Sequence, residues 1–169
     1  MTAEALHGPK VIPCRLTAAE EDTYTLYRLY QRDFDEALHT MRLMRRYRRP
    51  EVRYCLLRDA VIAYCRPFSG NRGHVHNRHK LPLRFVPRGS RSIHDDLVRR
   101  RHGLIAHTDI KERRPQIARW PARGRFVYLL GVAHGDWGSL DRKIGAVQAL
   151  VEAVTASLAI EIERLEAKT

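Results

Sequence analysis

The chain has 169 residues, a length that fits one domain and leaves no room for two enzymatic domains with separate cores. Its composition, with 44% hydrophobic and 30% charged residues, lies in the globular range and excludes a disordered or fibrous protein. Lysine and arginine total 31 against 19 acidic residues, a formal net charge of +12. This excess indicates a polyanionic partner, and nucleic acid is the leading candidate.

The sequence also indicates where the protein works. We expect no membrane association, because no continuous apolar run approaches the roughly 18 residues of a membrane span, and the N-terminus lacks the pattern of a signal peptide. Cys14, Cys55 and Cys65 form an odd set without CxxC spacing, which argues against disulfides and a cysteine zinc site. We therefore expect a cytoplasmic protein with reduced thiols, a single domain over residues 1–169 and a flexible N-terminus over 1–15.

Two helices are predicted in the first part of the chain. Thr17-Ala-Ala-Glu20 predicts a capping box that opens a helix over Ala18–Arg46, and Pro50 favours the first turn of a second helix over Glu51–Tyr64. Apolar residues recur at helical spacing in both segments. The expected core stripes are Tyr27, Tyr30, Phe34, Leu38, Met41 and Met44 in the first helix, and Val52, Leu56, Ala60 and Ala63 in the second.

The second part of the chain predicts a loop, two more helices and an insertion. Residues 67–89 show no period and are expected to form a long exposed basic loop. A third helix over Ser92–Ala106 has Ser90 or Ser92 as its cap, and the last helix covers Leu140–Ala167. Their stripes are Ile93, Leu97 and Leu104, and then Ile144, Val147, Val151, Val154, Leu158, Ile162 and Leu165.

The segment before the last helix is expected to be irregular or a small hairpin, in which Gln116–Ala118 pair with Phe126–Tyr128. The predicted fold is therefore all-α: a four-helix bundle with a long basic loop and a small insertion before the last helix.

One stretch at the end of the third helix concentrates cations and histidines. Arg101-His102-Gly103-Leu104-Ile105-Ala106-His107 resembles the R-polar-x4-6-H motif of the HEPN superfamily, with His102 at its polar second position. The following Thr108-Asp109 resembles the ending common in abortive-infection members, and Tyr64–Phe68 and Ile93–Asp96 resemble their wider context. The likeness covers about Tyr24 to the C-terminus in architecture and Ile93 to Asp109 in motif.

The resemblance implies a metal-independent endoribonuclease without a cofactor, in which two protomers bring their motifs together in a homodimer. It also implies an RNA substrate, and a toxin or phage-defence role with an antitoxin or defence-system partner protein. The residue types suit this chemistry, because His107 can transfer protons near neutrality and the planar fork of Arg101 can clamp a phosphate. His107 and Arg101 are the expected catalytic residues.

Helical geometry adds supporting residues and a constraint. Residues six apart on an ideal helix lie about 120° around the axis and about 9 Å along it, so Arg101 and His107 do not share one face. Either the helix loosens after Gly103, or the two groups converge with those of a second protomer. Arg100 precedes His107 by seven residues and His94 precedes Arg101 by seven, so each of these can line the same groove. Asp109 can orient an imidazole.

A structural interpretation of the same residues is the alternative. Arg99, Arg100 and Arg101 can form a solvated face with ion pairs to Asp95 and Asp96, with His107 as a helix C-terminal cation. In that case the protein is a non-catalytic basic bundle that binds nucleic acid or a partner protein.

Three weaker features remain. His74, His76 and His79 with Cys65 have a spacing that matches no closed zinc site, and we expect no metal. The same loop is better interpreted as a flexible cationic arm that follows a phosphate backbone. Nucleic-acid contacts are expected from Arg66, Arg72, Arg78, Lys80, Arg84, Arg88 and Arg99.

A second basic block, residues 42–53, is interpreted either as a solvated surface or as a second contact with nucleic acid. Trp120, Phe126, Tyr128 and Trp137 can stack on bases, but we expect them to be buried anchors of the insertion.

Overall fold

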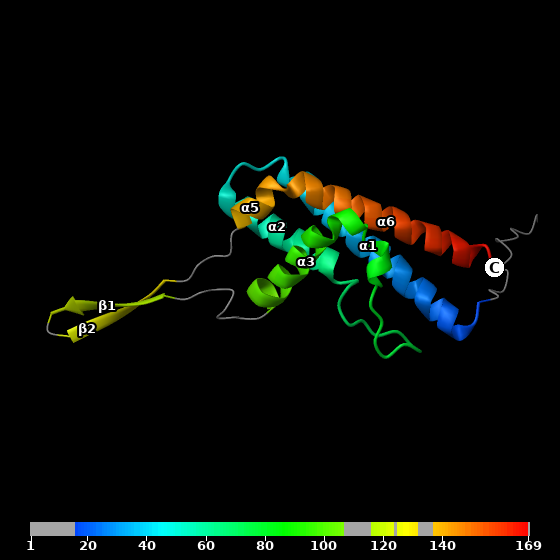
Figure 1. Cartoon of the computed structure of the whole chain (residues 1–169), viewed down its shortest axis with the longest axis horizontal. Helices are drawn as coiled ribbons and strands as arrows, with labels where there is room; N and C mark the ends of the chain where they lie inside the picture. The colour runs from blue at the N-terminus through cyan, green and yellow to red at the C-terminus, as the bar shows by residue number, and fades with distance from the viewer. Residues whose placement is uncertain (1–15, 107–115, 124, 132–136, 169) are drawn as a thin grey trace, which may run out of the picture.

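The computed structural model describes residues 16–106, 116–123, 125–131 and 137–168. Most of these residues are helical, and a two-stranded hairpin precedes the last helices, as Figure 1 shows. The helices are α1 (Ala18–Met44), α2 (Pro50–Cys65), α3 (Arg91–Arg100), α5 (Trp137–Arg142) and α6 (Ile144–Glu166). The predicted helical bundle with a hairpin insertion is thus confirmed in outline, although the last helix is preceded by the short helix α5.

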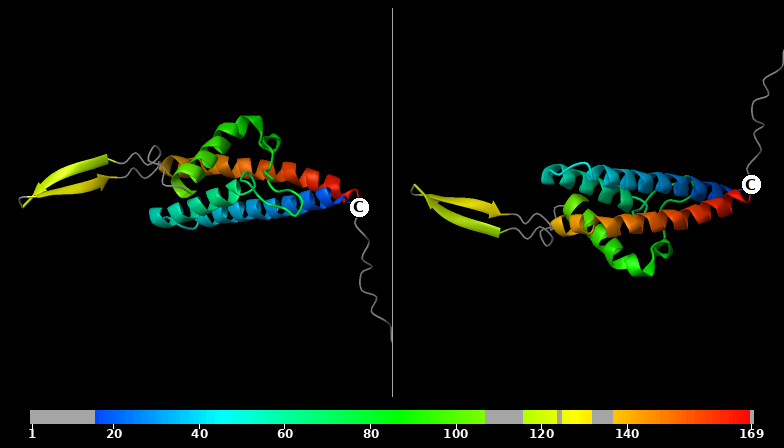
Figure 2. Two further views of the ribbon diagram at one scale, coloured as in Figure 1. Left: turned by 90° about the horizontal axis from the view of Figure 1, so that it is seen from below. Right: turned by 90° about the horizontal axis from the view of Figure 1, so that it is seen from above.

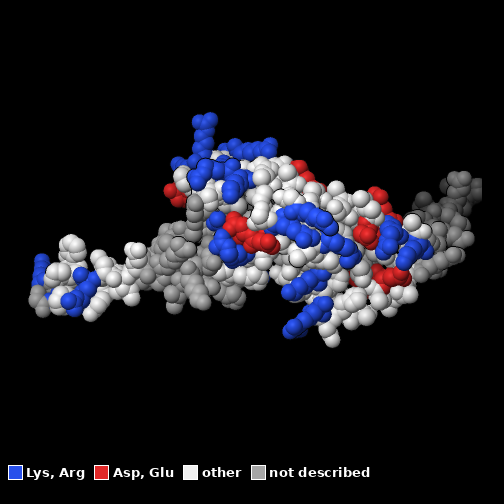
Figure 3. Space-filling view, viewed as in Figure 1, with Lys and Arg blue, Asp and Glu red and all other residues white. Residues whose placement is uncertain are grey.

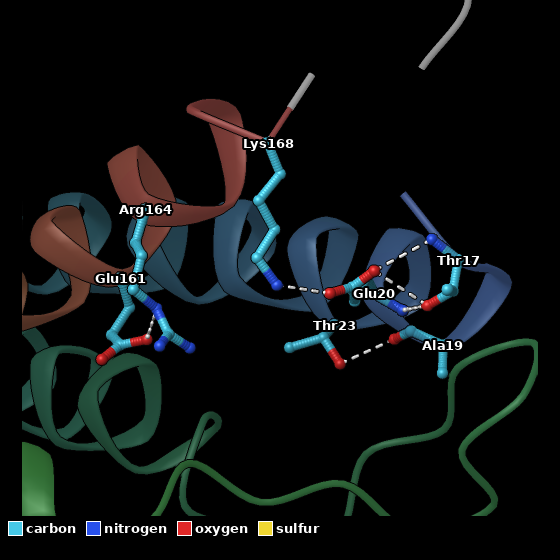
Figure 4. A network of polar contacts seen from close by, with 7 residues as sticks. All are labelled: Thr17, Ala19, Glu20, Thr23, Glu161, Arg164 and Lys168. Carbon is cyan, nitrogen blue, oxygen red and sulfur yellow. Dashed lines mark hydrogen bonds and ion pairs between the residues drawn. The ribbon is translucent and has the colours of Figure 1, made fainter. Parts of the chain in front are cut away.

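Helix α1 begins at the predicted capping box, which Figure 4 shows. The Thr17 hydroxyl accepts a hydrogen bond from the Glu20 backbone N–H at 3.3 Å, and the Glu20 carboxylate accepts one from the Thr17 N–H at 3.0 Å. Lys168 Nζ lies 2.6 Å from the same carboxylate and joins the start of α1 to the end of the chain after α6. The Lys168 hydrogen bond, followed by those of Thr17, lowers the pKa of Glu20 to about 2.

The core forms where the apolar stripes of α1 and α6 meet α2. All six predicted stripe residues of α1 are buried, and so are those of α6 apart from the half-buried Ile144. In α2 the predicted Ala60 and Ala63 are buried, whereas the predicted Val52 and Leu56 are only half-buried. The buried residues also include Leu57, Val61 and Tyr64. The second half of α2 is apolar on most sides, so its sequence identified only part of the buried face.

Helix α6 differs from the sequence expectation in one respect. By length and composition alone, this helix is long and apolar enough to cross a membrane, and it is the one such helix among the described residues. This property was not predicted from the sequence, because only a continuous apolar run was taken as the sign of a membrane span. In this fold its stripe packs against α1 and α3, and Val151, Val154 and Leu158 are fully buried.

Helix α3 crosses the other helices obliquely, and α1, α2 and α6 lie alongside one another in the views of Figure 2. Two short 3-10 helices, η1 (Leu83–Phe85) and η2 (Arg88–Ser90), lead into α3. A π-helical turn, η3 (Arg101–Ala106), continues it. Because α2 packs against both α3 and η3, the end of α2 supports the start of the HEPN-like motif.

The insertion is a hairpin of β1 (Gln116–Ala122) and β2 (Arg125–Gly131). The hairpin was predicted, but its pairing was not: Ala118 lies opposite Leu129, and Gln116 lies opposite Gly131. The strands are longer than expected because their turn lies at Arg123, which adopts a φ of 48° in the left-handed region.

The expected anchoring role of the aromatic residues is wrong for three of the four. Trp120, Phe126 and Tyr128 are exposed on the hairpin, with relative exposures of 64%, 53% and 69%. Trp137 is buried, as expected, at the start of α5. A two-stranded ribbon has no third layer to cover its side chains, which explains the difference.

We predict that Thr17→Ala lowers the free energy of unfolding by about 1 kcal/mol, because it leaves the Glu20 N–H in the first turn of α1 without its side-chain acceptor. Urea denaturation followed by circular dichroism measures this loss. Thr25→Ala is the matched control, since Thr25 is exposed within the same helix and alanine favours helices. Equal stability of Thr17→Ala and the wild type would mean that the capping box contributes nothing.

Candidate functional site

The HEPN-like motif begins where the hydrogen-bonding pattern of the third helix changes. Helix α3 ends at Arg100, and η3 continues from Arg101 with the wider i→i+5 pattern of a π-helix, an arrangement found frequently at functional sites. The expected loosening of this helix is therefore present, and it starts at Arg101 rather than after Gly103. His107 and Asp109 lie outside the described residues.

The two arginines before Arg101 are engaged in ion pairs within their own helix. Asp96 accepts hydrogen bonds from both Arg99 and Arg100, at i,i+3 and i,i+4 spacing. Asp95 is exposed and makes no ion pair with a described residue. The structural interpretation therefore fits Arg99 and Arg100, with Asp96 as the partner of both.

Arg100 in addition joins α3 to α5. Only 7% of the residue is exposed, its guanidinium lies 5.7 Å from the ring centroid of Trp137, and its Nε donates to Asp96 at 2.8 Å. A buried cation with an acidic partner and an aromatic surface is stabilised in place. Arg100 therefore acts in packing between α3 and α5.

Arg101 has different surroundings. It is half-buried, forms no ion pair with an acid of the described segments, and its Nη1 lies 3.3 Å from Nδ1 of the exposed His102. Arg101 also lies close enough to Cys65, the last residue of α2, to affect its thiol. Burial raises the pKa of this thiol to about 12, and the positive charge of Arg101 acts in the opposite direction. Arg101 and His102 are thus brought together at the start of the π-helical turn.

His94 is placed in the interface between α2 and α3 rather than in an open groove. It is 4% exposed, and its Nδ1 lies 2.8 Å from the Tyr64 hydroxyl oxygen. Its ring packs edge to face against the Phe68 ring, with the two ring centroids 4.5 Å apart. Burial lowers the pKa of His94 and raises that of Tyr64. The neutral imidazole and the phenol form a hydrogen bond that fixes α3 on α2, so the structure gives His94 a role in packing.

The basic loop between α2 and η1 is tied to helix α1. The carboxylate of Asp22, a buried residue, accepts three backbone N–H groups, from His74 at 2.7 Å, Val75 at 3.1 Å and His76 at 2.9 Å. The hydrogen bond from His76 is the largest of the effects that lower the pKa of Asp22. Gly73 packs so closely on this carboxylate that an added Cβ would overlap it.

Further contacts fold the loop on itself. Asn71 and His79 form an isolated antiparallel bridge, and Nδ1 of His79 lies 2.9 Å from the Tyr30 hydroxyl. Leu81 and Phe85 are buried in the core. The loop is therefore a fixed platform on α1, which corrects the expectation of a flexible arm. Sequence patterns did not indicate Asp22 as the anchor of the loop, because its partners are backbone groups more than fifty residues away.

The loop histidines serve this anchoring. His76 Nε2 lies 3.3 Å from the Thr23 hydroxyl, and burial lowers the pKa of His79. Within the described part of the chain, no three His, Cys, Asp or Glu side chains are grouped so that they could hold a metal ion.

The cations expected to contact nucleic acid fall into two groups. Arg66 Nη1 lies 3.1 Å from Asp33 and 2.6 Å from Glu36. These three residues border a surface depression of about 420 Å³ beside α1, so the charge of Arg66 is largely compensated. The other loop cations are exposed and form no ion pair with an acid of the described ranges: Arg72, Arg78, Lys80, Arg84 and Arg88.

Lys and Arg side chains far outnumber acidic ones on the face drawn in Figure 3. Part of the basic block at residues 42–53 nevertheless has a structural role. Arg53 donates to both carboxylate oxygens of Asp141 and to the backbone oxygen of Met44, and Arg45 donates to Gln148. These contacts fix the turn between α1 and α2 to α5 and α6. The other arginines of the block are exposed and form no ion pair with an acid of the described residues, so this turn and the loop are both candidates for a phosphate-binding surface: Arg42, Arg46, Arg48 and Arg49.

Comparison of the chain with known protein families, with curated proteins and with solved structures finds no significant match.

We predict that Asp22→Asn releases the basic loop. The folded-state pKa of Asp22 lies below its ordinary value of 3.8, so the stabilisation is fully present above that pH and is lost as the pH falls through the lower folded value. Amide hydrogen exchange at His74, Val75 and His76 should be faster in the variant near neutral pH.

Asp35→Asn is the matched control, because Asp35 is exposed on the same helix. The resonances of the three loop amides should also titrate below pH 3.8 in the wild type and not in Asp22→Asn. Unchanged exchange in Asp22→Asn would show that the bridge between Asn71 and His79 holds the loop without the carboxylate.

Proposed function

We propose that this protein is a HEPN-type, metal-independent endoribonuclease whose catalytic residues are Arg101 and His107. The observation that carries the proposal is that Arg101 forms no ion pair with a described residue. Of the run Arg99 to Arg101, it is the arginine without an acidic partner among the described residues, and it stands at the change from α- to π-helix beside His102. A cation held in this way is available to a phosphate.

The proposed reaction is attack by an RNA 2′-hydroxyl on the adjacent phosphorus. His107 takes the proton of the attacking hydroxyl or supplies the proton of the departing 5′-oxygen, while Arg101 donates hydrogen bonds to the non-bridging oxygens as negative charge develops on them. The new P–O2′ bond forms as the P–O5′ bond breaks. The products are a 2′,3′-cyclic phosphate and a 5′-hydroxyl.

The proposal places the site between two copies of the chain. The support for this is the resemblance, in which two protomers bring their motifs together; in each copy His107 follows Arg101 by six residues, after the π-helical turn Arg101–Ala106. A two-fold axis beside η3 would bring two copies of each residue around one basic groove. Asp109 would orient an imidazole there, and His102 would support Arg101.

The biological setting proposed from the resemblance is a cytoplasmic toxin or phage-defence effector, with an antitoxin or a defence-system protein as its partner. The second candidate function is a non-catalytic bundle that binds nucleic acid. It is favoured by the exposed cations of the loop, which lie on a platform fixed by Asp22 and need no reactive group to bind phosphates.

We predict that Arg101→Ala and His107→Ala each slow RNA cleavage by about 10²–10⁴-fold, because one removes the charge opposite the phosphoryl oxygens and the other removes proton transfer. Cleavage of labelled RNA, with product ends identified by mass spectrometry, measures both effects. Activity should persist in EDTA and be absent on DNA, which lacks the attacking hydroxyl.

Arg28→Ala is the matched control for loss of one positive charge, because Arg28 is exposed on α1 and belongs to no proposed site. Its rate should equal that of the wild type. Full cleavage by the Arg101→Ala, His107→Ala double variant, or equal cutting of RNA and DNA, would place the active site elsewhere. A wild type that binds RNA without cutting it would favour the second candidate function.

A further inference from the structure

The hairpin carries large side chains that no other part of the described structure covers. Ile117, Trp120, Phe126 and Tyr128 each have more than half of their surface exposed, and Leu129 is 51% exposed. An isolated two-stranded hairpin is at best marginally stable in water, and clustered exposed apolar side chains mark interaction surfaces. The hairpin is therefore expected to bind a partner.

The strand register divides these side chains between two faces. Residues directly opposite in an antiparallel pair lie on the same face, so Arg119 shares a face with Tyr128, and Pro121 shares it with Phe126. The Arg119 guanidinium also lies over the Phe126 ring, 4.1 Å from its centroid. This face presents two aromatic rings, about 7 Å apart along the strand, with an arginine beside them.

The charge of the hairpin identifies the class of partner. Arg119, Arg123 and Arg125 are exposed and form no ion pair with a described acid, and the sequence has no acidic residue from position 113 to 135. In Figure 3 the hairpin shows basic and uncharged atoms and no acidic ones. Aromatic rings interleaved with arginines are the pattern by which proteins bind single-stranded nucleic acid: bases stack on the rings and phosphates meet the cations.

We propose that the hairpin is a binding arm for single-stranded RNA, in which a base stacks on the exposed ring of Tyr128 while Arg119, held over the Phe126 ring, contacts a phosphate. The choice of RNA rests on the function proposed above, whereas the argument for base stacking and phosphate contact uses only the side chains of the hairpin. The opposite face carries Trp120, Val127 and Leu129. Because Val127 and Leu129 have no ring on which a base can stack, they provide a control within the same two strands.

The experiment measures binding without cleavage. The probe is a fluorescein-labelled oligoadenylate of about 12 nucleotides with a 2′-O-methyl group on every sugar, which removes the attacking hydroxyl. Tyr128→Leu should raise the Kd by about 5- to 150-fold, the range measured for loss of one stacked base, whereas Tyr128→Phe should keep the wild-type Kd. Leu129→Ala should also leave the Kd unchanged.

A second variant tests the charge independently of stacking. Arg119→Gln should lower the salt dependence of binding by about 0.7 in the slope of log K against log salt, the value for one phosphate contact to a single strand. Tyr128→Leu should leave this slope unchanged.

The proposal would be overturned if Tyr128→Leu bound the probe with the wild-type Kd. It would also be overturned if the wild type bound a duplex as tightly as the single strand and Tyr128→Leu did not change that affinity. A loss caused by Leu129→Ala but not by Tyr128→Leu would also overturn it, and would assign the hairpin to a protein partner. A wild type that binds the probe through Tyr128 but cleaves no RNA refutes the proposed nuclease and leaves the arm in place. A wild type that cleaves RNA while Tyr128→Leu binds normally refutes the arm alone.

Discussion

Burial of one apolar stripe along α6 is the constraint on which the remaining structure depends. The stripe packs against α1 and α3, and its central residues Val151, Val154 and Leu158 have no exposed surface. Burying side chains of this size contributes about 1.5–3 kcal/mol each relative to exposure, far more than any surface ion pair. Helix α3 must therefore lie across α6, and its last residue, Arg100, is brought against Trp137 of α5. Arg101 follows directly.

The cations of this basic protein are of two kinds: some form ion pairs that join elements of the fold, and others are exposed without an acidic partner among the described residues. Arg53, Arg66, Arg99 and Arg100 are bound to acids and hold elements together. Arg101 and the exposed loop cations have no such partner among the described residues. Net charge alone would count all of them as a nucleic-acid surface. The geometry removes the acid-bound arginines from the proposed nucleic-acid surface, and leaves for it Arg101 and the exposed cations of the loop, of the turn between α1 and α2, and of the hairpin.

The sequence was sufficient for the helices whose patterns are strongly periodic. In α1, the capping box at Thr17 and the stripe from Tyr27 to Met44 both predicted what the structure shows, because local hydrogen bonds and a 3.6-residue period act within one segment. The buried face of α2 was predicted only in part, through Ala60 and Ala63, since the second half of the helix is apolar on most sides. The hairpin was predicted with the wrong register, because pairing depends on where the turn falls.

The site could be predicted only where it depends on neighbours in sequence. The pairing of Arg99 and Arg100 with an acid follows from i,i+3 and i,i+4 spacing. The burial of His94 against Phe68 and the anchoring of the loop by Asp22 depend on contacts between distant segments. No periodicity or motif encodes such contacts. The change from α- to π-helix at Arg101, where η3 packs on α2, was likewise not predicted at this residue.

The most direct test of a site formed by two chains is complementation between two inactive variants. Arg101→Ala and His107→Ala proteins are mixed under conditions that allow subunit exchange, and RNA cleavage by the mixture is compared with cleavage by each variant alone. If the two chains share one site, mixed dimers contain an intact Arg101 and an intact His107, so the mixture should recover activity that neither variant has. An inactive mixture, with mixed dimers demonstrated by differently tagged subunits, would contradict the account.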